Sequence, residues 1–240
     1  MTQILSNRSI HLARDISSAD LLGGVVLTKS LLKTLSSVRK SALEQVNDNA
    51  FAIVGPYGSG KSTTALLLYH YLCGTLQGDV QKKLDNLNIV KLPSKSRYNK
   101  AFVLVGDNTS LNESIKEAFG IAQEQSLIPW LEDELKKGSR IAIFIDEMGK
   151  YLEYAAEFPN EGDVYVLQQI AELAARSAGN LLLVTIRHQG LMAYVSKLPT
   201  TYLNEWKKIQ GRFSDLIHIN SVDESIKIIY DRLEALGITS

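Results

Sequence analysis

The chain has 240 residues, 45% of them hydrophobic and 22% charged, an ordinary composition for a globular protein whose length suits one large α/β domain. Its formal net charge is zero, which neither points to a nucleic-acid partner nor excludes a local basic patch. The single cysteine, Cys73, excludes an internal disulfide, and no apolar run approaches the roughly 20 residues of a membrane helix, so we expect a cytoplasmic protein.

Residues 1–49 are expected to form an N-terminal extension with a packing helix. Residues 1–27 carry no clear pattern apart from a short turn at residues 20–24. A helix is predicted from residue 28 to about residue 46, with Thr28 as its N-cap. Its apolar residues recur at steps of three or four, which indicates a helix that packs on the core: Leu31, Leu35, Val38, Ala42 and Val46.

The next segment carries a phosphate-binding loop. An apolar run, Ala50–Val54, predicts a strand, a helix is expected over residues 62–72, and GPYGSGKS between them fits the pattern G-x-x-x-x-G-K-S. Glycines let backbone N–H groups point inward, and the following helix adds its positive end, so the loop can hold phosphate oxygens. We expect Lys61 to reach the β- and γ-phosphates and Ser62 to ligate Mg²⁺. The complete motif with its flanks favours phosphate binding over a glycine-rich turn that merely caps a helix. The expected nucleotide contacts are Gly55, Pro56, Tyr57, Gly58, Ser59, Gly60, Lys61, Ser62 and Thr63.

Residues 74–100 interrupt the alternation of strands and helices with a basic insertion. Six basic side chains stand against two acidic ones, Asp79 and Asp85. The segment could contact nucleic acid, or it could equally be a solvated surface insertion, which is the usual reading of a charge run. The basic residues are Lys82, Lys83, Lys91, Lys95, Arg97 and Lys100.

The remaining pattern predicts the fold class. Buried apolar runs that alternate with helices indicate an α/β fold of the P-loop NTPase type, with a mainly parallel five-stranded sheet covered by helices on both faces. Beyond the elements around the P-loop, the expected strands are 101–105, 141–145, 181–186 and 216–219, and the expected helices are 111–137 with a break near Pro129, 163–178, 201–209 and 222–236.

The strand expected over residues 141–145 ends in two carboxylates. In an open parallel sheet, ligands bind at the carboxyl ends of the strands, so these side chains should lie beside the P-loop. We expect Asp146 to hold Mg²⁺ beside Ser62, through water, and Glu147 to act as the general base that polarises the attacking water. Strands often end in acidic residues, so the pair alone is a weak indication of a nucleotide site. It becomes a stronger indication because it follows a P-loop with one predicted strand between them.

Two further places supply candidate catalytic residues. The strand over residues 181–186 is followed by polar side chains that could sense the γ-phosphate, namely Thr185, Arg187 and His188, against the alternative of a core threonine and a capping histidine. Arg212 precedes the last expected strand and could reach the nucleotide of a neighbouring subunit, against the alternative of a surface ion pair.

The order of these motifs resembles the AAA+ ATPases and their relatives, the STAND NTPases, in the ASCE division of P-loop ATPases. The resemblance covers about residues 50–220. Asp146 and Glu147 match the second nucleotide motif, Arg212-Phe213 resembles the Arg-Phe of the finger-bearing segment, and Val184–Arg187 is similar to the sensor of STAND proteins. The two relatives assign the sensor differently, so that residue stays open.

The resemblance implies ATP and Mg²⁺ as ligands and an oligomer or larger complex as the working state. AAA+ proteins carry a helical lid after the fifth strand, whereas residues 221–240 offer about one helix, so we expect the lid to be reduced or missing. The chain could be the N-terminal ATPase part of a larger phage-defence or DNA-processing protein.

We therefore expect an ATPase module that drives assembly or remodelling of a larger complex, in association with nucleic acid or without it. One alternative is a STAND-like switch in which bound nucleotide gates oligomerisation with little turnover. A small-molecule kinase of the P-loop type is disfavoured by the Asp146-Glu147 pair and by the lack of an arginine-rich lid.

Overall fold

The computed structural model of the chain describes residues 10–44, 46–158, 164–194 and 200–235, with the side chains of residues 200–202, 232 and 235 excepted. The first nine residues of the N-terminal extension lie outside this part of the chain. So do residue 163, the predicted start of one helix, and residue 236, the predicted end of another.

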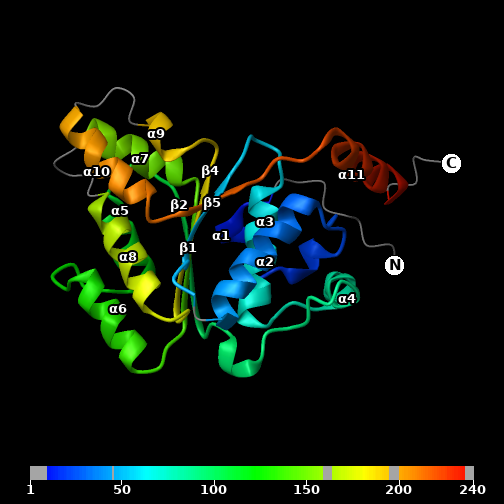
Figure 1. Cartoon of the computed structure of the whole chain (residues 1–240), viewed down its shortest axis with the longest axis horizontal. Coiled ribbons are helices and arrows are strands. Elements are labelled where there is room, and N and C mark those ends of the chain that lie inside the picture. Colours follow the sequence, from blue (N-terminus) through cyan, green and yellow to red (C-terminus); the bar gives the residue numbers. More distant parts are fainter. Residues whose placement is uncertain (1–9, 45, 159–163, 195–199, 236–240) are drawn as a thin grey trace.

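Five strands form one parallel sheet in the order β2-β3-β4-β1-β5. β1 (Ala50–Val54) lies between β4 (Leu181–Arg187) and β5 (Ser214–Ile217), and β3 (Ile141–Asp146) and β2 (Lys100–Val105) follow beyond β4. All neighbouring strands run parallel, so their carboxyl ends meet at one edge of the sheet. The predicted α/β fold with a parallel five-stranded sheet is confirmed, and Figure 1 shows the sheet standing between two groups of helices.

Side-chain alternation along the strands explains why both faces of the sheet are covered. On β3, three isoleucines at positions 141, 143 and 145 belong to one buried cluster, whereas Ala142 and Phe144 belong to the other. Successive side chains of a strand point to opposite faces, so an uninterrupted apolar run needs cover on both sides. One face carries α1 (Leu12–Asp15), α2 (Lys29–Glu44), α3 (Lys61–Cys73) and α4 (Gly78–Asn86), and the other carries α5 (Leu111–Phe119), α6 (Leu127–Lys136), α7 (Met148–Glu157), α8 (Tyr165–Arg176), α9 (Leu191–Tyr194) and α10 (Thr200–Gln210).

The described part of the N-terminal extension belongs to the core of the first face. As predicted, Thr28 caps α2, because its Oγ1 accepts a hydrogen bond from the backbone N–H of Leu31 at 3.3 Å. The described residues before it, which show no clear pattern in the sequence, include α1 and the 3-10 turn η1 (Ala19–Leu22). Leu12 and Leu22 in these two elements are fully buried in the same cluster as α2 and α3. This segment therefore contributes to the core rather than lying outside it.

The basic segment 74–100 lies at the surface, where most of its residues are exposed, including Lys82, Lys91 and Lys95, but it is also anchored to the core. It contains α4 and a second 3-10 turn, η2 (Ser94–Ser96). Apolar residues between its lysines anchor it to the core cluster, since Val80, Leu84, Leu92 and Tyr98 are all buried there.

Helix boundaries in the region 111–137 differ from the prediction in a way that follows from backbone chemistry. The break between α5 and α6 begins at Gly120, which ends α5 in the left-handed conformation at φ 68°. Pro129, where we expected the break, lies instead in the first turn of α6. Proline is tolerated there because the first N–H groups of a helix have no partner within it.

Two other elements correct the sequence prediction. Helix α7 was missed, although Met148, Tyr151, Leu152 and Ala155 form a buried stripe at helical spacing in the sequence itself. Strand β5 starts at Ser214, two residues earlier than predicted, because its pairing with β1 rather than its own short apolar run sets its bounds.

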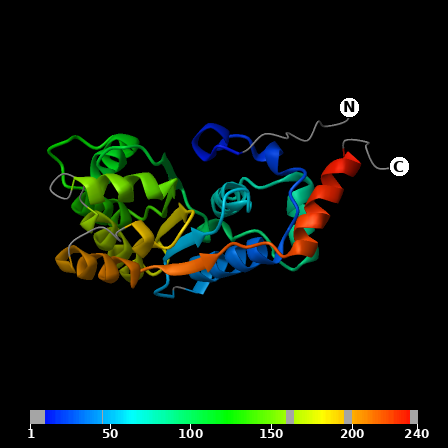
Figure 2. The same ribbon diagram turned by 90° about the horizontal axis from the view of Figure 1, so that it is seen from above.

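Helix α11 (Val222–Ala235) follows β5 and lies at the end of the molecule opposite α5 to α10 (Figure 2). Its apolar residues Val222, Ile226, Ile229 and Tyr230 are exposed. No helix in the described ranges is long and apolar enough to cross a membrane.

Candidate functional site

The P-loop joins the carboxyl end of β1 to the first turn of α3. Gly60, the residue before the helix, has φ 88°, a left-handed conformation that glycine adopts without strain. The backbone N–H of Thr64 donates to the Gly60 carbonyl at 2.9 Å, which closes the first helical turn. No side chain in the described part of the chain caps this helix. The N–H groups of its first turn are therefore available to an anion, as the sequence motif predicts.

Lys61 lies inside the loop. Its side chain is buried, and Nζ donates a hydrogen bond to the backbone carbonyl of Pro56 at 2.7 Å. Burial lowers the pKa of the Lys61 ammonium, and the nearby charge of Asp146 opposes that shift. The ammonium thus lies between the two arms of the P-loop, within the electrostatic field of the β3 carboxylate.

Ser62 and Asp146 meet at the carboxyl edge of the sheet. The Ser62 hydroxyl donates to Oδ2 of Asp146 at 3.2 Å, and the other carboxylate oxygen accepts the backbone N–H of Glu147 at 2.8 Å. Burial raises the pKa of Asp146, while these two hydrogen bonds act in the opposite direction. The structure therefore brings together two of the residues that the sequence assigns to the metal.

Glu147 follows directly and starts α7 with an unusual backbone. Its φ is 48°, in the left-handed region that a residue with a side chain rarely adopts. Its carboxylate lies within 2.6 Å of Lys150 Nζ, one turn along α7. The predicted base is thus beside the P-loop edge but turned toward a lysine of its own helix.

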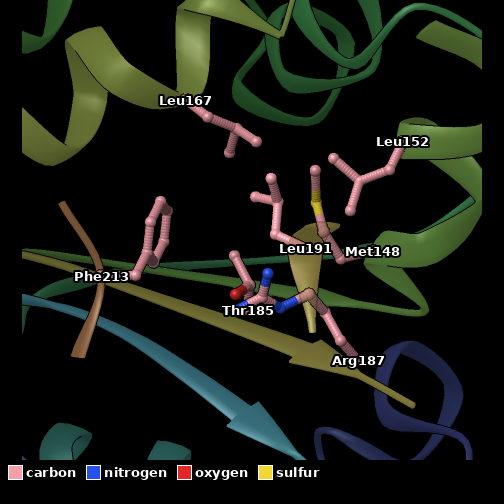
Figure 3. Close-up of a pocket in the computed structure, with 7 residues that line it drawn as sticks. All are labelled: Met148, Leu152, Leu167, Thr185, Arg187, Leu191 and Phe213. Atoms are coloured by element: carbon pink, nitrogen blue, oxygen red, sulfur yellow. The ribbon is translucent and has the colours of Figure 1, made fainter. Parts of the chain in front are cut away.

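Arg187, a sensor candidate, is folded away from the P-loop edge. Its side chain is only 2% exposed, and it pairs with Oδ1 of Asp215 on β5 at 2.9 Å. Asp215 and Thr185 flank Ala52 in the same row of the sheet, so the guanidinium crosses β1 above the small Ala52 side chain. Figure 3 shows Arg187 beside Thr185, beneath apolar side chains from α7, α8 and α9.

Burial lowers the pKa of the Arg187 guanidinium, and the Asp215 carboxylate opposes this shift. The strand alternation that we predicted for Thr185 and Arg187 places both in the pocket of Figure 3. In this conformation neither side chain is directed at the carboxyl edge, and their sensor role stays a prediction.

His188, the third sensor candidate, lies just past the end of β4 against the P-loop. Its ring stacks on that of Tyr57 with centroids 3.5 Å apart and an interplanar angle of 26°. Burial and the charge of Lys61 lower the pKa of His188, while Glu147 and Asp146 oppose the shift. Of the three sensor candidates, His188 is the one that faces the charged residues of the site. No pattern in the sequence indicates the Tyr57 contact, which joins the segments that follow two different strands, β1 and β4.

Arg212 lies at the other end of the sheet. It precedes Ser214, which pairs with Phe51 near the start of β1, whereas the P-loop follows the end of that strand. Its guanidinium pairs with Glu172 of α8 at 2.9 Å and is 51% exposed. Arg212 cannot reach the P-loop of its own chain from this position.

Sequence reasoning also missed two residues behind the P-loop, His218 and Asn220. Both follow β5, and each lies within hydrogen-bonding distance of the loop or of α3. Nothing in the sequence could have found them, because the contact depends on β5 lying beside β1.

Comparisons with known proteins bear on the fold. No protein-family profile and no curated protein matches the chain. Among solved structures, it is similar to the ORC2 protein of Aeropyrum pernix in ADPNP-ADP complexes, with 12% identity, 88% of this chain and 53% of that chain covered, and a TM-score of 0.53. It is also similar to Cdc6p from Pyrobaculum aerophilum, with 14% identity, 98% and 52% covered, and a TM-score of 0.48. For Drosophila ORC bound to GC-rich DNA and Cdc6, the identity is 10%, the coverage 98% and 36%, and the TM-score 0.37.

The chain spans about half the length of the first two of these proteins and about a third of the last. At such low identity the similarity to the ORC2 protein concerns the fold alone, and with the sheet order it confirms the predicted P-loop NTPase fold. None of these structures supports the STAND alternative.

Proposed function

We propose that this chain, which has the fold of the AAA+ P-loop ATPases, binds ATP with Mg²⁺ and hydrolyses it. The observation that carries this proposal is the contact of Ser62 with Asp146 at 3.2 Å, next to a buried Lys61. A hydroxyl and a carboxylate are oxygen ligands of the kind that Mg²⁺ prefers, and Mg²⁺ usually takes only one or two protein ligands beside substrate phosphates. The two side chains therefore suit a Mg²⁺ that arrives with a nucleotide.

The P-loop residues have distinct roles in this proposal. The uncapped N–H groups at the start of α3 bind the phosphate oxygens, and Lys61 exchanges the Pro56 carbonyl for a phosphate oxygen. When bound, Mg²⁺ neutralises charge on the phosphates and would be held by Ser62 and Asp146. Together these residues bind and orient the nucleotide.

Glu147 is the proposed general base. To accept a proton from water beside the γ-phosphate, its carboxylate has to turn away from Lys150, with which it pairs in this conformation. A half-exposed ion pair of this kind contributes little stability, so the turn costs little free energy. The same change would leave Lys150 free for a solvent or phosphate contact.

Two variants with controls test the ATPase. Lys61→Ala removes the phosphate contact and should abolish nucleotide binding, measured by titration calorimetry. Glu147→Gln should keep binding and remove turnover. Lys40→Ala and Glu157→Gln are the matched controls, because both residues are exposed and lie on other parts of the surface. If the Glu147→Gln protein hydrolyses ATP normally, Glu147 is not the base.

Arg212 is proposed to act on the nucleotide of a neighbouring copy. It is half-exposed, held by a surface pair with Glu172, and remote from its own P-loop. Such an arginine can raise turnover by about 10³–10⁵. Mixing Arg212→Ala with Glu147→Gln should restore turnover that neither variant shows alone, since one copy supplies the base and the other the arginine. A mixture as inactive as its parts would assign Arg212 to its surface ion pair.

The finer part of the proposal is that turnover drives assembly or remodelling of a complex on nucleic acid. Lys82, Lys91 and Lys95 remain exposed on the segment 74–100, although Lys82 already lies 3.6 Å from Asp79. Duplex DNA should bind more weakly to a Lys91→Glu/Lys95→Glu protein than to the wild type, whereas the control Lys40→Glu/Lys136→Glu should bind like the wild type. Equal weakening by both pairs, or no DNA binding at all, would remove nucleic acid from the proposal.

A further inference from the structure

Residues 218–220 run directly behind the P-loop. The backbone N–H of His218 donates to the carbonyl of Val54 at 2.7 Å, which continues the pairing of β5 with β1 up to the start of the loop. A Cβ on Gly55 would lie 2.2 Å from the His218 carbonyl oxygen, so only glycine fits where the two backbones meet. The first residue of the P-loop is therefore packed against the connector between β5 and α11.

The His218 ring supports the far arm of the same loop. It is 1% exposed, and its Nε2 lies 3.3 Å from Oγ1 of Thr64. The Thr64 hydroxyl donates its own proton to the Gly60 carbonyl at 3.0 Å, so toward the ring it can only accept. We therefore assign the hydrogen of the neutral ring to Nε2, from which the ring contacts the turn of Gly60 and Thr64.

Asn220 makes a second contact with the loop. Its Nδ2 donates to the carbonyl of Ser59 at 3.4 Å, and its Oδ1 accepts from the Ser30 hydroxyl at 3.2 Å. Ser59 has no other support from its side chain, because its buried hydroxyl has no hydrogen-bond partner among the described residues. Asn220 thus ties the middle of the P-loop to the first turn of α2.

One carboxylate then anchors the connector to two helices. Glu224 accepts the backbone N–H of Lys29, at the start of α2, at 2.6 Å. Its other oxygen accepts the N–H of Ser221 at 3.0 Å, and the Ser221 hydroxyl accepts the N–H of Glu224 at 3.2 Å, so the pair forms a capping box for α11. The connector is held at both ends, by β5 and by this double cap.

We propose that the β5–α11 connector is a positioning element of the nucleotide site, in which His218 and Asn220 hold the arm Ser59–Gly60 of the P-loop in its phosphate-binding curve. A glycine-rich loop has to be ordered before its N–H groups converge on phosphate, and ordering costs conformational entropy at each residue. Contacts that order the loop in advance remove part of that cost from binding. This role rests on the proposed function, because it needs a nucleotide to bind at the P-loop.

The same contacts make the coupling between the connector and the phosphate site reciprocal. If the connector improves phosphate binding, then phosphate binding must stabilise the connector by the same free energy. We therefore expect saturating nucleotide to slow hydrogen exchange at the amides of His218 and Asn220 as well as in the P-loop. A histidine that merely fills space would not link the two segments in this way.

The experiment compares His218→Leu, which removes the hydrogen bond, with His218→Gln, whose amide nitrogen can replace Nε2. Thr64→Val removes the same bond from the other partner, together with the hydrogen bond of the Thr64 hydroxyl to the Gly60 carbonyl. His70→Leu is the control. His70 lies on α3 and is buried like His218, but its ring is within hydrogen-bonding distance of Thr75 rather than of the P-loop. The readouts are the dissociation constants of ATP and ADP with Mg²⁺, turnover at saturating ATP, and hydrogen exchange with and without nucleotide.

We expect His218→Leu and Thr64→Val to weaken nucleotide binding about 10-fold, the equivalent of one directed hydrogen bond, while turnover at saturation changes much less. The double variant should bind no more weakly than Thr64→Val alone, and His218→Gln should bind within about 3-fold of the wild type. Should His218→Leu fail to fold, Thr64→Val and Asn220→Ala carry the same comparison.

Two contrary results separate this role from the proposed function. If the wild type binds nucleotide and the His218 and Thr64 variants bind equally well, the connector has no positioning role and the ATPase proposal stands. If the folded wild type binds no nucleotide, both proposals fail. Equal weakening by His70→Leu would also overturn the role, since it would reveal a general loss of stability.

Discussion

Gly106, the residue after β2, offers a sharp test of the base assigned to Glu147. Its backbone N–H donates to the carbonyl of Asp146 at 2.8 Å. A Cβ built on Gly106 would lie 2.0 Å from the carbonyl oxygen of Glu147 and 2.8 Å from its carbonyl carbon. The backbone that carries the proposed base is therefore packed directly on a glycine, and Gly106→Ala should push that backbone away.

The size of the displacement follows from these distances. Real Cβ atoms essentially never come closer than 3.0 Å to another heavy atom, so the Glu147 carbonyl has to move by about 1 Å. A displacement of ~1 Å at a catalytic group can reduce the rate about 100-fold. We expect turnover at saturating ATP to fall by about that factor. Nucleotide affinity should change little, because the P-loop and Lys61 follow β1, which does not pair with β2 or β3.

Steady-state ATP hydrolysis measures the turnover, nucleotide titration measures the affinity, and thermal unfolding checks that the variant is folded. Gly190→Ala is the control, because a Cβ there meets nothing within 4 Å and the backbone φ is ordinary. The reasoning is refuted if a folded Gly106→Ala protein hydrolyses ATP at the wild-type rate. It is also refuted if nucleotide affinity falls as much as turnover, since the damage would then lie at the P-loop.

Three further predictions concern stability and reactivity. Asp215→Asn removes the charge that balances the buried Arg187. Because the Asp215 side chain is 34% exposed, we expect the free energy of unfolding in urea to fall by about 1–2 kcal/mol, less than for a fully buried pair. An unchanged free energy of unfolding would contradict the pairing. Burial and the Lys61 charge lower the pKa of His218 to about 4, so below about pH 6.5 the unfolded chain takes up a proton that the folded one does not. The contribution of His218 to stability is therefore full above pH 6.5 and falls by up to about 3 kcal/mol toward pH 4, so the loss of stability between pH 8 and pH 5 should be smaller in His218→Gln than in the wild type. Burial raises the pKa of Cys73 to about 11, so iodoacetamide at pH 8 should alkylate the folded protein about 100-fold more slowly than the unfolded one, and equal rates would contradict a packed thiol.

The sequence predicted the parts of the site that are local in the chain. The P-loop is a contiguous motif, and Asp146 and Glu147 follow an apolar run that can only be a buried strand, so their placement at one edge follows from the parallel sheet. Ser62 and Asp146, 84 residues apart, could be paired in advance because the P-loop and the end of β3 are expected at the same edge of a parallel sheet.

Contacts that depend on the order of the strands in the sheet could not be predicted from the sequence. Arg187 pairs with Asp215 because β1 lies between their strands and presents a small side chain, Ala52, at the crossing point. No periodicity in either strand reports that neighbour. His218 lies behind the P-loop for the same reason, and its spacing from Gly60 along the chain carries no signal.

The position of β1 inside the sheet also sets when the site can form during synthesis. Within the described residues, β1 pairs only with β4 and β5, which lie about 130 and about 160 residues farther along the chain. At roughly 5–20 residues per second, β5 follows β1 from the ribosome after roughly 8–30 s. Throughout that interval the strand that carries the P-loop has no partner, while β2 and β3 can already pair with each other. We therefore expect the phosphate-binding loop to take shape last, so that ATP cannot assist the early steps of folding and stabilises only a chain that has been made as far as β5.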